Sequence, residues 1–245
     1  MNISANSSKA YQPLIHDDVH LVDNYPKVAL TVDCVIFGYD EGELKVLLIK
    51  SDLEKYDGLY SLLGDVVHVR EDIDTAAYRV LQQRTGMTDV YLEQVRCFSK
   101  PSRHPGGRVV TIAYCSLLNI KHHQLQITDN GLHWHSVKTI DKLAFDHKEI
   151  LETCYEWLQK MVQEDPLAFN LLPDKFSMRE LQNVYEAIWG IELDRRNFRK
   201  KFASMDLLVD INEMEEDVPH RPGKLYTFNY EKYHKKQRKF VGLDF

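Results

Sequence analysis

The sequence predicts an α+β protein in which an α/β/α sandwich built on a mixed sheet is followed by a winged helix-turn-helix domain. Three observations predict this fold. Apolar, β-branched runs separated by turn residues fill much of the first half of the chain, as is typical of strands. Two segments within residues 72–163 carry apolar residues at helical spacing. Towards the C-terminus, two short helical patterns joined by a glycine turn precede two short strands.

Length and composition limit the class of protein. The chain has 245 residues, 44% of them hydrophobic and 28% charged, which suits one large globular domain or two modest ones. No apolar run approaches the ~18 residues that cross a membrane, and segment 1–26 lacks the pattern of a secretion signal. We therefore expect a flexible leader over 1–26, a cytoplasmic location and no membrane partner.

Charge and cysteine usage add two expectations. The net charge of −6 is unevenly distributed, with −7 on the first 175 residues and +1 on segment 176–245, which is consistent with a polyanionic partner for the C-terminal part. The four cysteines have no CxxC spacing, so small core residues are more consistent with them than disulfides or a zinc site. They are Cys34, Cys97, Cys115 and Cys154.

We assign residues 27–145 to a first domain, and most of its expected elements are strands. Segments 27–39 and 44–49 flank a turn and predict a hairpin at the edge of the sheet, and further strands are expected over 90–98, 108–118 and 132–136. The Pro- and Gly-rich loop 99–107 is as consistent with a plain connection as with a ligand-facing loop. His133 and His135 alternate along the last strand, and without a third ligand they indicate a half-exposed strand, not a metal site.

A helix is expected over 72–85, with Gly86 as its C-cap. The surrounding stretch 64–87 resembles the catalytic box of the Nudix hydrolases, in which glutamates on one helix face bind a divalent metal. Five residues match that pattern, and four depart from it. The matches are Glu71, Arg79, Leu81, Gly86 and Met87, while Asp65 replaces the first glycine and Val80, Gln83 and Arg84 replace the three helical glutamates.

These replacements argue against hydrolysis. Mg²⁺ requires several converging oxygen ligands, and the cation of Arg84 would repel it. We therefore expect no bound metal, no cofactor and no catalytic residue, in a Nudix fold that has kept a pocket. The alternative of a chance match in an ordinary helix is less consistent with the rest of the chain.

A long amphipathic helix is expected over 146–163, with a wide apolar stripe. It can pack on its own sheet, or it can connect domains or subunits. We assign 146–165 as a connecting helix, because Asp165 and Pro166 mark a boundary.

The segment 166–245 has the pattern of a winged helix domain. Ser177 and Glu180 form a capping box at the start of one helix, Gly190 ends it, and Asp194 can cap a second helix over 195–205. Apolar residues of the second helix share one sector, so the opposite face is expected to meet the major groove of DNA, although a merely solvated basic face is the alternative. The expected DNA contacts on this helix are Arg195, Arg196, Asn197, Arg199 and Lys200.

Two strands over 207–211 and 225–230 indicate a wing after this helix. Arg221 and Lys224 lie between them and are expected to hold the DNA backbone. The acidic run 213–217 is expected at the far side of the hairpin, in solvent.

Over residues 27–240 the chain resembles the NrtR-like family of Nudix-related transcriptional regulators. Members of this family combine a Nudix domain with a C-terminal winged helix domain. The most specific motifs are AFNLLP at 168–173, LQNVYEAIWG at 181–190 and RNFRKK at 196–201. The resemblance implies a homodimer that binds palindromic double-stranded operator DNA, usually as a repressor. It also implies release of the operator when an effector enters the Nudix pocket, either ADP-ribose, in control of NAD synthesis, or a pentose such as arabinose in the AraR-type branch.

Seven residues around the box and the 99–107 loop are the expected effector contacts: Asp65, His68, Glu71, Gln83, Arg84, Arg103 and Arg108. Without metal ligands, such a pocket suits a sugar or sugar phosphate at least as well as a metal-bridged nucleotide. Two alternatives remain. One is a residual Nudix hydrolase of a nucleoside diphosphate derivative such as ADP-ribose, and the other is a protein-interaction adaptor without DNA affinity.

Overall fold

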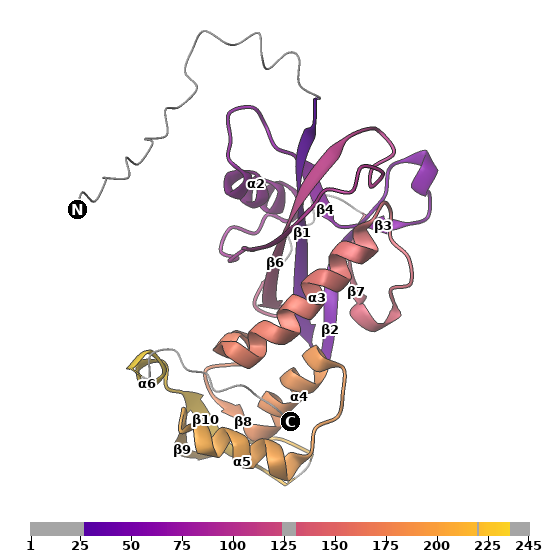
Figure 1. Ribbon diagram of the computed structural model, residues 1–245. Coiled ribbons are helices and arrows are strands. Elements are labelled where there is room, and N and C mark those ends of the chain that lie inside the picture. Colours follow the sequence, from indigo (N-terminus) through magenta and orange to yellow (C-terminus); the bar gives the residue numbers. More distant parts are fainter. Residues whose placement is uncertain (1–26, 124–130, 220, 236–245) are drawn as a thin grey trace, which may run out of the picture.

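The computed structural model describes residues 27–123, 131–219 and 221–235 (Figure 1). It has a sheet-containing domain and a smaller helical domain, with a long helix running along the first towards the second. This arrangement confirms the predicted α+β fold class, a Nudix-like mixed sheet followed by a winged helix. The predicted leader over 1–26 lies outside the described residues.

The large sheet has seven strands in the order β3-β2-β1-β6-β5, with β4 also paired to β1 and β7 to β2. It is mixed because β1 and β6 are parallel while the other pairs are antiparallel. The strands are β1 (Ala29–Asp40), β2 (Glu43–Lys50), β3 (Tyr60–Ser61), β4 (Leu63–Val66), β5 (Glu93–Phe98), β6 (Val109–Asn119) and β7 (Leu132–Ser136).

The β1–β2 hairpin was predicted at the edge of the sheet, and this prediction is wrong. The hairpin exists, but β1 lies at the centre because β6, some 70 residues further along, pairs with it in parallel from Ala29 to Tyr39. Burial explains the position, since residues 32–38 of β1 are buried on both faces.

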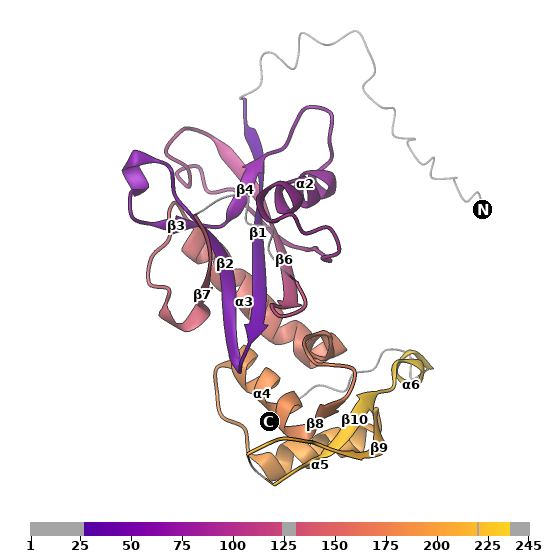
Figure 2. The same ribbon diagram turned by 180° about the vertical axis from the view of Figure 1, so that it is seen from behind.

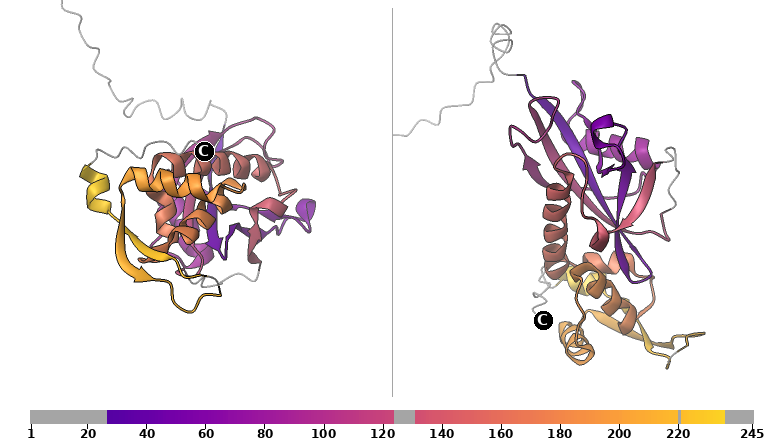
Figure 3. Two further views of the ribbon diagram at one scale, coloured as in Figure 1. Left: turned by 90° about the horizontal axis from the view of Figure 1, so that it is seen from below. Right: turned by 90° about the vertical axis from the view of Figure 1, so that its right-hand side faces the viewer.

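Alternating residues of β1 divide the apolar core into two layers. Val32, Cys34 and Ile36 pack towards α2 (Ile73–Thr85), the predicted box helix. Val35 and Phe37 point to the other face, which α3 (His147–Glu164) covers. Figure 2 and the right-hand view of Figure 3 show the two helices on opposite faces of the sheet. The short helices η1 (Glu54–Tyr56) and η2 (Val137–Thr139) lie in the connections.

The second domain follows a turn of 3-10 helix, η3 (Pro166–Leu171), and packs around aromatic rings. Phe169, Tyr185 and Phe202 meet there, with centroids of Tyr185 and Phe202 5.4 Å apart. Its remaining elements are β8 (Phe176–Ser177), α4 (Met178–Trp189), α5 (Arg195–Met205), β9 (Leu208–Met214), β10 (Lys224–Phe228) and α6 (Tyr230–Lys235). Figure 1 shows α4, α5 and the β9–β10 hairpin together at one end of the molecule, and the left-hand view of Figure 3 looks onto that end.

Three cysteines are core residues as predicted, since Cys34, Cys115 and Cys154 are buried. Cys97 is different, because it lies exposed on the edge strand β5. None of the helices in the described ranges is long and apolar enough to cross a membrane.

Candidate DNA-binding face and effector cleft

Helix α5 presents the cationic face that its sequence predicts. The Asp194 carboxylate accepts a hydrogen bond from the Asn197 N–H at 2.8 Å and caps the helix. Phe198, Phe202 and Met205 are buried, which fixes the rotation of the helix about its axis. The predicted DNA contacts therefore lie exposed on the outer side: Arg195, Arg196, Asn197, Arg199 and Lys200.

Arg179 extends this face, although no pattern in the sequence indicates it. Arg179 is exposed on the first turn of α4 and lines two neighbouring hollows. It shares one with Arg195 and Arg199, and the other with Arg199 and Arg221. Only the three-dimensional arrangement of α4 against α5 brings these guanidinium groups together, so helical periodicity could not reveal it.

The wing is less cationic than predicted. Arg221 is exposed near Arg199, but the Lys224 ammonium donates to an Asp210 carboxylate oxygen at 2.5 Å. This hydrogen bond raises the pKa of Lys224 and lowers that of Asp210. The prediction that the acidic run 213–217 lies at the far side of the hairpin is wrong. Its first two residues end β9, which continues to Met214, and residues 215–217 lie in the same connection as Arg221, where Glu215 accepts from the Gly223 N–H at 2.8 Å.

In the first domain, Arg79 is the centre of a hydrogen-bond network around the box. It donates to both oxygens of Glu71, at 3.0 and 2.7 Å, to an Asp65 carboxylate oxygen at 3.3 Å and to the Gln83 amide oxygen at 3.2 Å. The His68 N–H donates to Glu71 at 2.7 Å. Three of the predicted effector residues, Asp65, Glu71 and Gln83, thus contact Arg79, and a fourth, His68, contacts Glu71.

This network does not fit the divalent metal that a Nudix fold implies. Hydrogen bonds from Arg79, and then from the His68 backbone, lower the pKa of Glu71 to about 2, so the carboxylate is ionised and already accepts three hydrogen bonds. Val80 is buried on the sheet, and positions 83 and 84 carry an amide and a cation. Within the described residues, no three His, Cys, Asp or Glu side chains converge as metal ligands would.

Arg84 lies in a cleft of about 600 Å³ between α2 and the sheet. Lys50 and Asp52 line it from the end of β2, Asp57 from the following loop and Ser61 from β3. No sequence pattern singles out these four residues, because a polar loop after a strand is ordinary. Of the seven predicted effector residues, Arg84 is the one that the structure places among the lining residues of this cleft.

Arg103 and Arg108 lie elsewhere. The Arg103 side chain is 3% exposed and forms a two-point ion pair with Asp146, with distances of 2.9 and 2.8 Å. Arg108 is exposed and donates to the Ser99 carbonyl at 2.6 Å, which closes the 99–107 loop. Both arginines therefore hold this loop in place in the structure.

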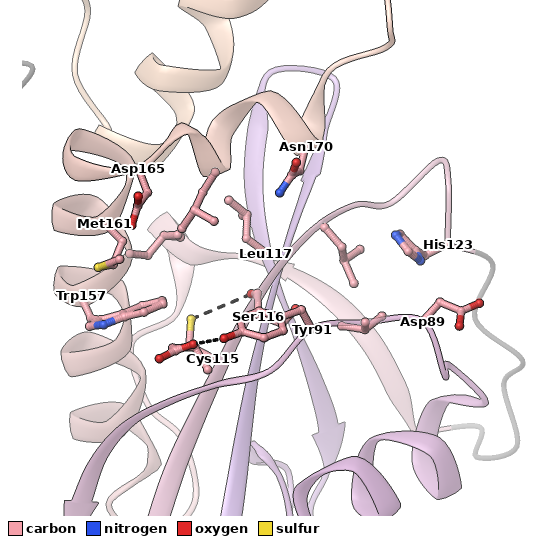
Figure 4. A pocket seen from close by; sticks show the side chains of 15 residues that line it. Asp89, Tyr91, Cys115, Ser116, Leu117, His123, Trp157, Met161, Asp165 and Asn170 are labelled. Atoms are coloured by element: carbon pink, nitrogen blue, oxygen red, sulfur yellow. Dashed lines mark hydrogen bonds between the residues drawn. The ribbon is translucent and has the colours of Figure 1, made fainter. Parts of the chain in front are cut away.

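A second hollow, largely apolar, lies beside α3 near the winged helix domain (Figure 4). Trp157 and Met161 of α3 face Leu117 of β6 across it, and Tyr91 lies at its side. Asp165 at its end accepts a hydrogen bond from the Tyr233 hydroxyl at 2.8 Å. The predicted site residues are not among the residues that line it.

A cationic helix in a winged helix domain, joined to a Nudix-like domain with a ligand-sized cleft, defines a class of protein: DNA-binding regulators with a sensor domain. The profile of the NrtR DNA-binding winged helix domain matches residues 168–228. The chain belongs to the NrtR-like family of Nudix-related transcriptional regulators, as the resemblance in its motifs predicted.

Two relatives document this membership, one of them through two crystal structures. The ADPR responsive transcriptional repressor NtrR of Acinetobacter baylyi is 33% identical over 215 residues, 86% of each chain. The crystal structure of Shewanella oneidensis NrtR complexed with a 27mer DNA is 29% identical, with a TM-score of 0.69 over 81% of this chain and 93% of that one. The NUDIX domain of the same protein complexed with ADP ribose is 28% identical, with a TM-score of 0.50 over 58% of this chain and 99% of that one.

Proposed function

We propose that this protein is a transcriptional repressor that releases its operator when ADP-ribose fills the cleft lined by Arg84. The observation that carries the proposal is the position of Arg84. It stands where a Nudix hydrolase has a metal-binding glutamate, and it lines a ligand-sized cleft together with Lys50. The names of the relatives from Acinetobacter and Shewanella, one ADPR responsive and one seen with ADP ribose, support this choice of effector.

The chemistry of the cleft suits a nucleotide sugar without a metal. Arg84 and Lys50 supply two cations for a diphosphate, and a guanidinium can bind phosphate oxygens in two places at once. Asp52, Asp57 and Ser61 offer oxygen acceptors for ribose hydroxyls. A diphosphate can contact both cations at once, whereas a free pentose such as arabinose offers neutral hydroxyls alone, so a charged ligand is the better match.

We infer that the box binds without hydrolysis. A residual hydrolase would have to hold its metal on Glu71, whose two oxygens already accept hydrogen bonds from Arg79. Mg²⁺-dependent release of a product from ADP-ribose by the purified protein would contradict this inference.

For the DNA side, we propose a homodimer that places two copies of α5 in successive major grooves of a palindromic operator. The exposed residues of α5 would contact bases and phosphates, while Arg179 and Arg221 would contact the flanking backbone. The ion pair of Lys224 with Asp210 makes Lys224 the weaker contact of the wing.

The cleft is tested by titration calorimetry with ADP-ribose and with L-arabinose in the presence of EDTA. Removing one charge-assisted contact to a phosphate costs ~1.5–3 kcal/mol, so Arg84→Gln should weaken ADP-ribose binding about 10- to 100-fold. Arg70→Gln is the matched control, because Arg70 is exposed and does not line the cleft. Undiminished ADP-ribose affinity in Arg84→Gln, or tighter binding of arabinose than of ADP-ribose, would contradict the proposal.

A further inference from the structure

The wall of the effector cleft is hydrogen-bonded to the start of α3 on both sides of Ser61. The Leu62 N–H donates to His147 Nδ1 at 2.9 Å, and the Ala144 N–H donates to the Tyr60 carbonyl at 2.8 Å. Ser61 and Leu62 themselves line the cleft. A ligand that displaces this short strand therefore also displaces the first turn of α3.

His147 is held in one orientation. It is the first residue of α3 and is 7% exposed. Because Nδ1 accepts a hydrogen bond, the ring proton lies on Nε2, which faces an Asp33 carboxylate oxygen at 3.6 Å. Asp33 is itself fixed by the Thr111 hydroxyl at 2.7 Å. Burial lowers the pKa of His147, which favours the neutral ring that this contact needs.

A second connection reaches the same point from the other side of the cleft. Tyr56 belongs to the loop that supplies Asp52 and Asp57, and its ring lies 4.6 Å from that of Phe145. The Phe145 ring in turn lies 5.0 Å from that of His147. Phe145 has a φ of 54°, a left-handed conformation that is strained for a bulky residue. Such strain is typical of segments with two competing arrangements.

The far end of α3 is fixed to the DNA-binding domain. The Trp189 indole N–H donates to the Gln159 carbonyl at 3.2 Å, and the Gln159 amide donates back to the Ile188 carbonyl at 3.2 Å. The Tyr185 hydroxyl contacts the Val162 carbonyl at 3.4 Å. A helix of 18 residues at a rise of 1.5 Å spans about 27 Å, so a tilt at its first turn moves the winged helix domain.

We propose that His147 is the positioning residue that transmits occupancy of the cleft to the DNA-binding face, through its contact with Leu62 and the rigid helix α3. The inference rests on the proposed function, because it needs a ligand in the cleft and DNA on α5. It assigns the coupling between the two sites to one side chain that touches neither ligand.

The test compares the affinity for duplex DNA with and without saturating ADP-ribose in four full-length proteins. They are the parent, His147→Leu, His147→Asn and the control Ile150→Val. Leucine removes the acceptor for the Leu62 N–H, whereas the Asn Oδ1 can replace Nδ1. Ile150 is buried one turn further along the same face of α3 and does not line the cleft. Ile150→Val therefore shows how much the coupling changes when the packing of α3 is weakened without loss of the His147 contact.

Typical coupling between two sites changes affinity by about 5- to 150-fold. If the parent lies in this range, His147→Leu should bind DNA and ADP-ribose separately within about threefold of the parent, yet ADP-ribose should change its DNA affinity less than about twofold. His147→Asn and Ile150→Val should retain most of the parental coupling.

Parental coupling in His147→Leu would overturn the inference. If His147→Leu does not fold, Tyr56→Leu replaces it, because this half-buried position makes the second connection through Phe145. Tyr56→Leu should reduce the coupling, and unchanged coupling in this variant would overturn the inference. A parent that binds both molecules without mutual effect overturns the proposed function as well as this inference. Loss of coupling in Ile150→Val to the same extent would show that His147 has no special part.

Discussion

Arg79 accounts for much of what survives of the Nudix box. Its hydrogen bonds hold Glu71, Asp65 and Gln83 against the start and middle of α2, so these residues shape the loop that precedes the helix. The ion pair with Arg79 therefore holds the Glu71 side chain in position, and it needs no metal. Arg84, by contrast, lines the cleft, so the residues of one sequence motif have two separate roles.

Single residues of α5 could be assigned from the sequence because helical periodicity alone separates Phe198 and Phe202 from Arg196 and Arg199. The cleft residues could not be assigned in this way. Lys50, Ser61 and Arg84 come from three elements that meet only after the sheet forms. Arg103 was a reasonable candidate as a loop arginine, but its buried contact with Asp146 depends on where α3 begins.

Arg199 provides the test of the DNA-binding face at this scale. It is exposed on α5 between two hollows lined by other arginines, so we expect Arg199→Ala to weaken operator binding by ~1–3 kcal/mol. Fluorescence anisotropy over a range of salt concentrations measures this. If Arg199 contacts a base, the variant should lose its preference for the operator over random DNA. If it contacts a phosphate, the slope of log K against log salt concentration should become shallower by about 1. Unchanged affinity for both DNAs would contradict the assignment, and Arg70→Ala, outside this face, is the control.

At the scale of elements, local signals predicted local structure well. The capping box of α4 is present with both of its hydrogen bonds, and α5 begins after Asp194 and ends at Met205 as expected. Errors arose where distant segments meet. The central place of β1 depends on parallel pairing with β6, and the wing turn carries acidic residues because β9 extends further than its apolar residues indicate.

The α4 cap makes a quantitative prediction. Ser177 is buried and accepts from the Glu180 N–H at 3.3 Å, while Glu180 accepts from the Ser177 N–H at 2.7 Å. Loss of an N-cap side chain costs ~1 kcal/mol, so Ser177→Ala should lower the free energy of unfolding by about that amount in urea denaturation. Ser204→Ala removes an exposed hydroxyl in α5 and should stay within about 0.5 kcal/mol of the parent. Equal stability of the two variants would show that the cap contributes nothing.

At the scale of the whole molecule, the two domains share one apolar core. It runs from Val35 and Phe37 on the sheet, through Leu158 of α3, to Val184 and Phe202 in the winged helix domain. Asn119 at the end of β6 also donates to the Leu171 carbonyl at 2.6 Å, across the junction. Such a continuous core lets a change at the cleft alter the position of α5, which a flexible linker would not.

The central claim is that ADP-ribose, without a metal, controls DNA binding through this connection. It is tested most directly by titrating ADP-ribose into the complex of the full-length protein with a labelled duplex from the region upstream of its own gene, in EDTA, while anisotropy is recorded. We predict that the duplex is released in a saturable manner and that the apparent DNA affinity falls at least fivefold. A complex that keeps its anisotropy at saturating ADP-ribose would contradict the account.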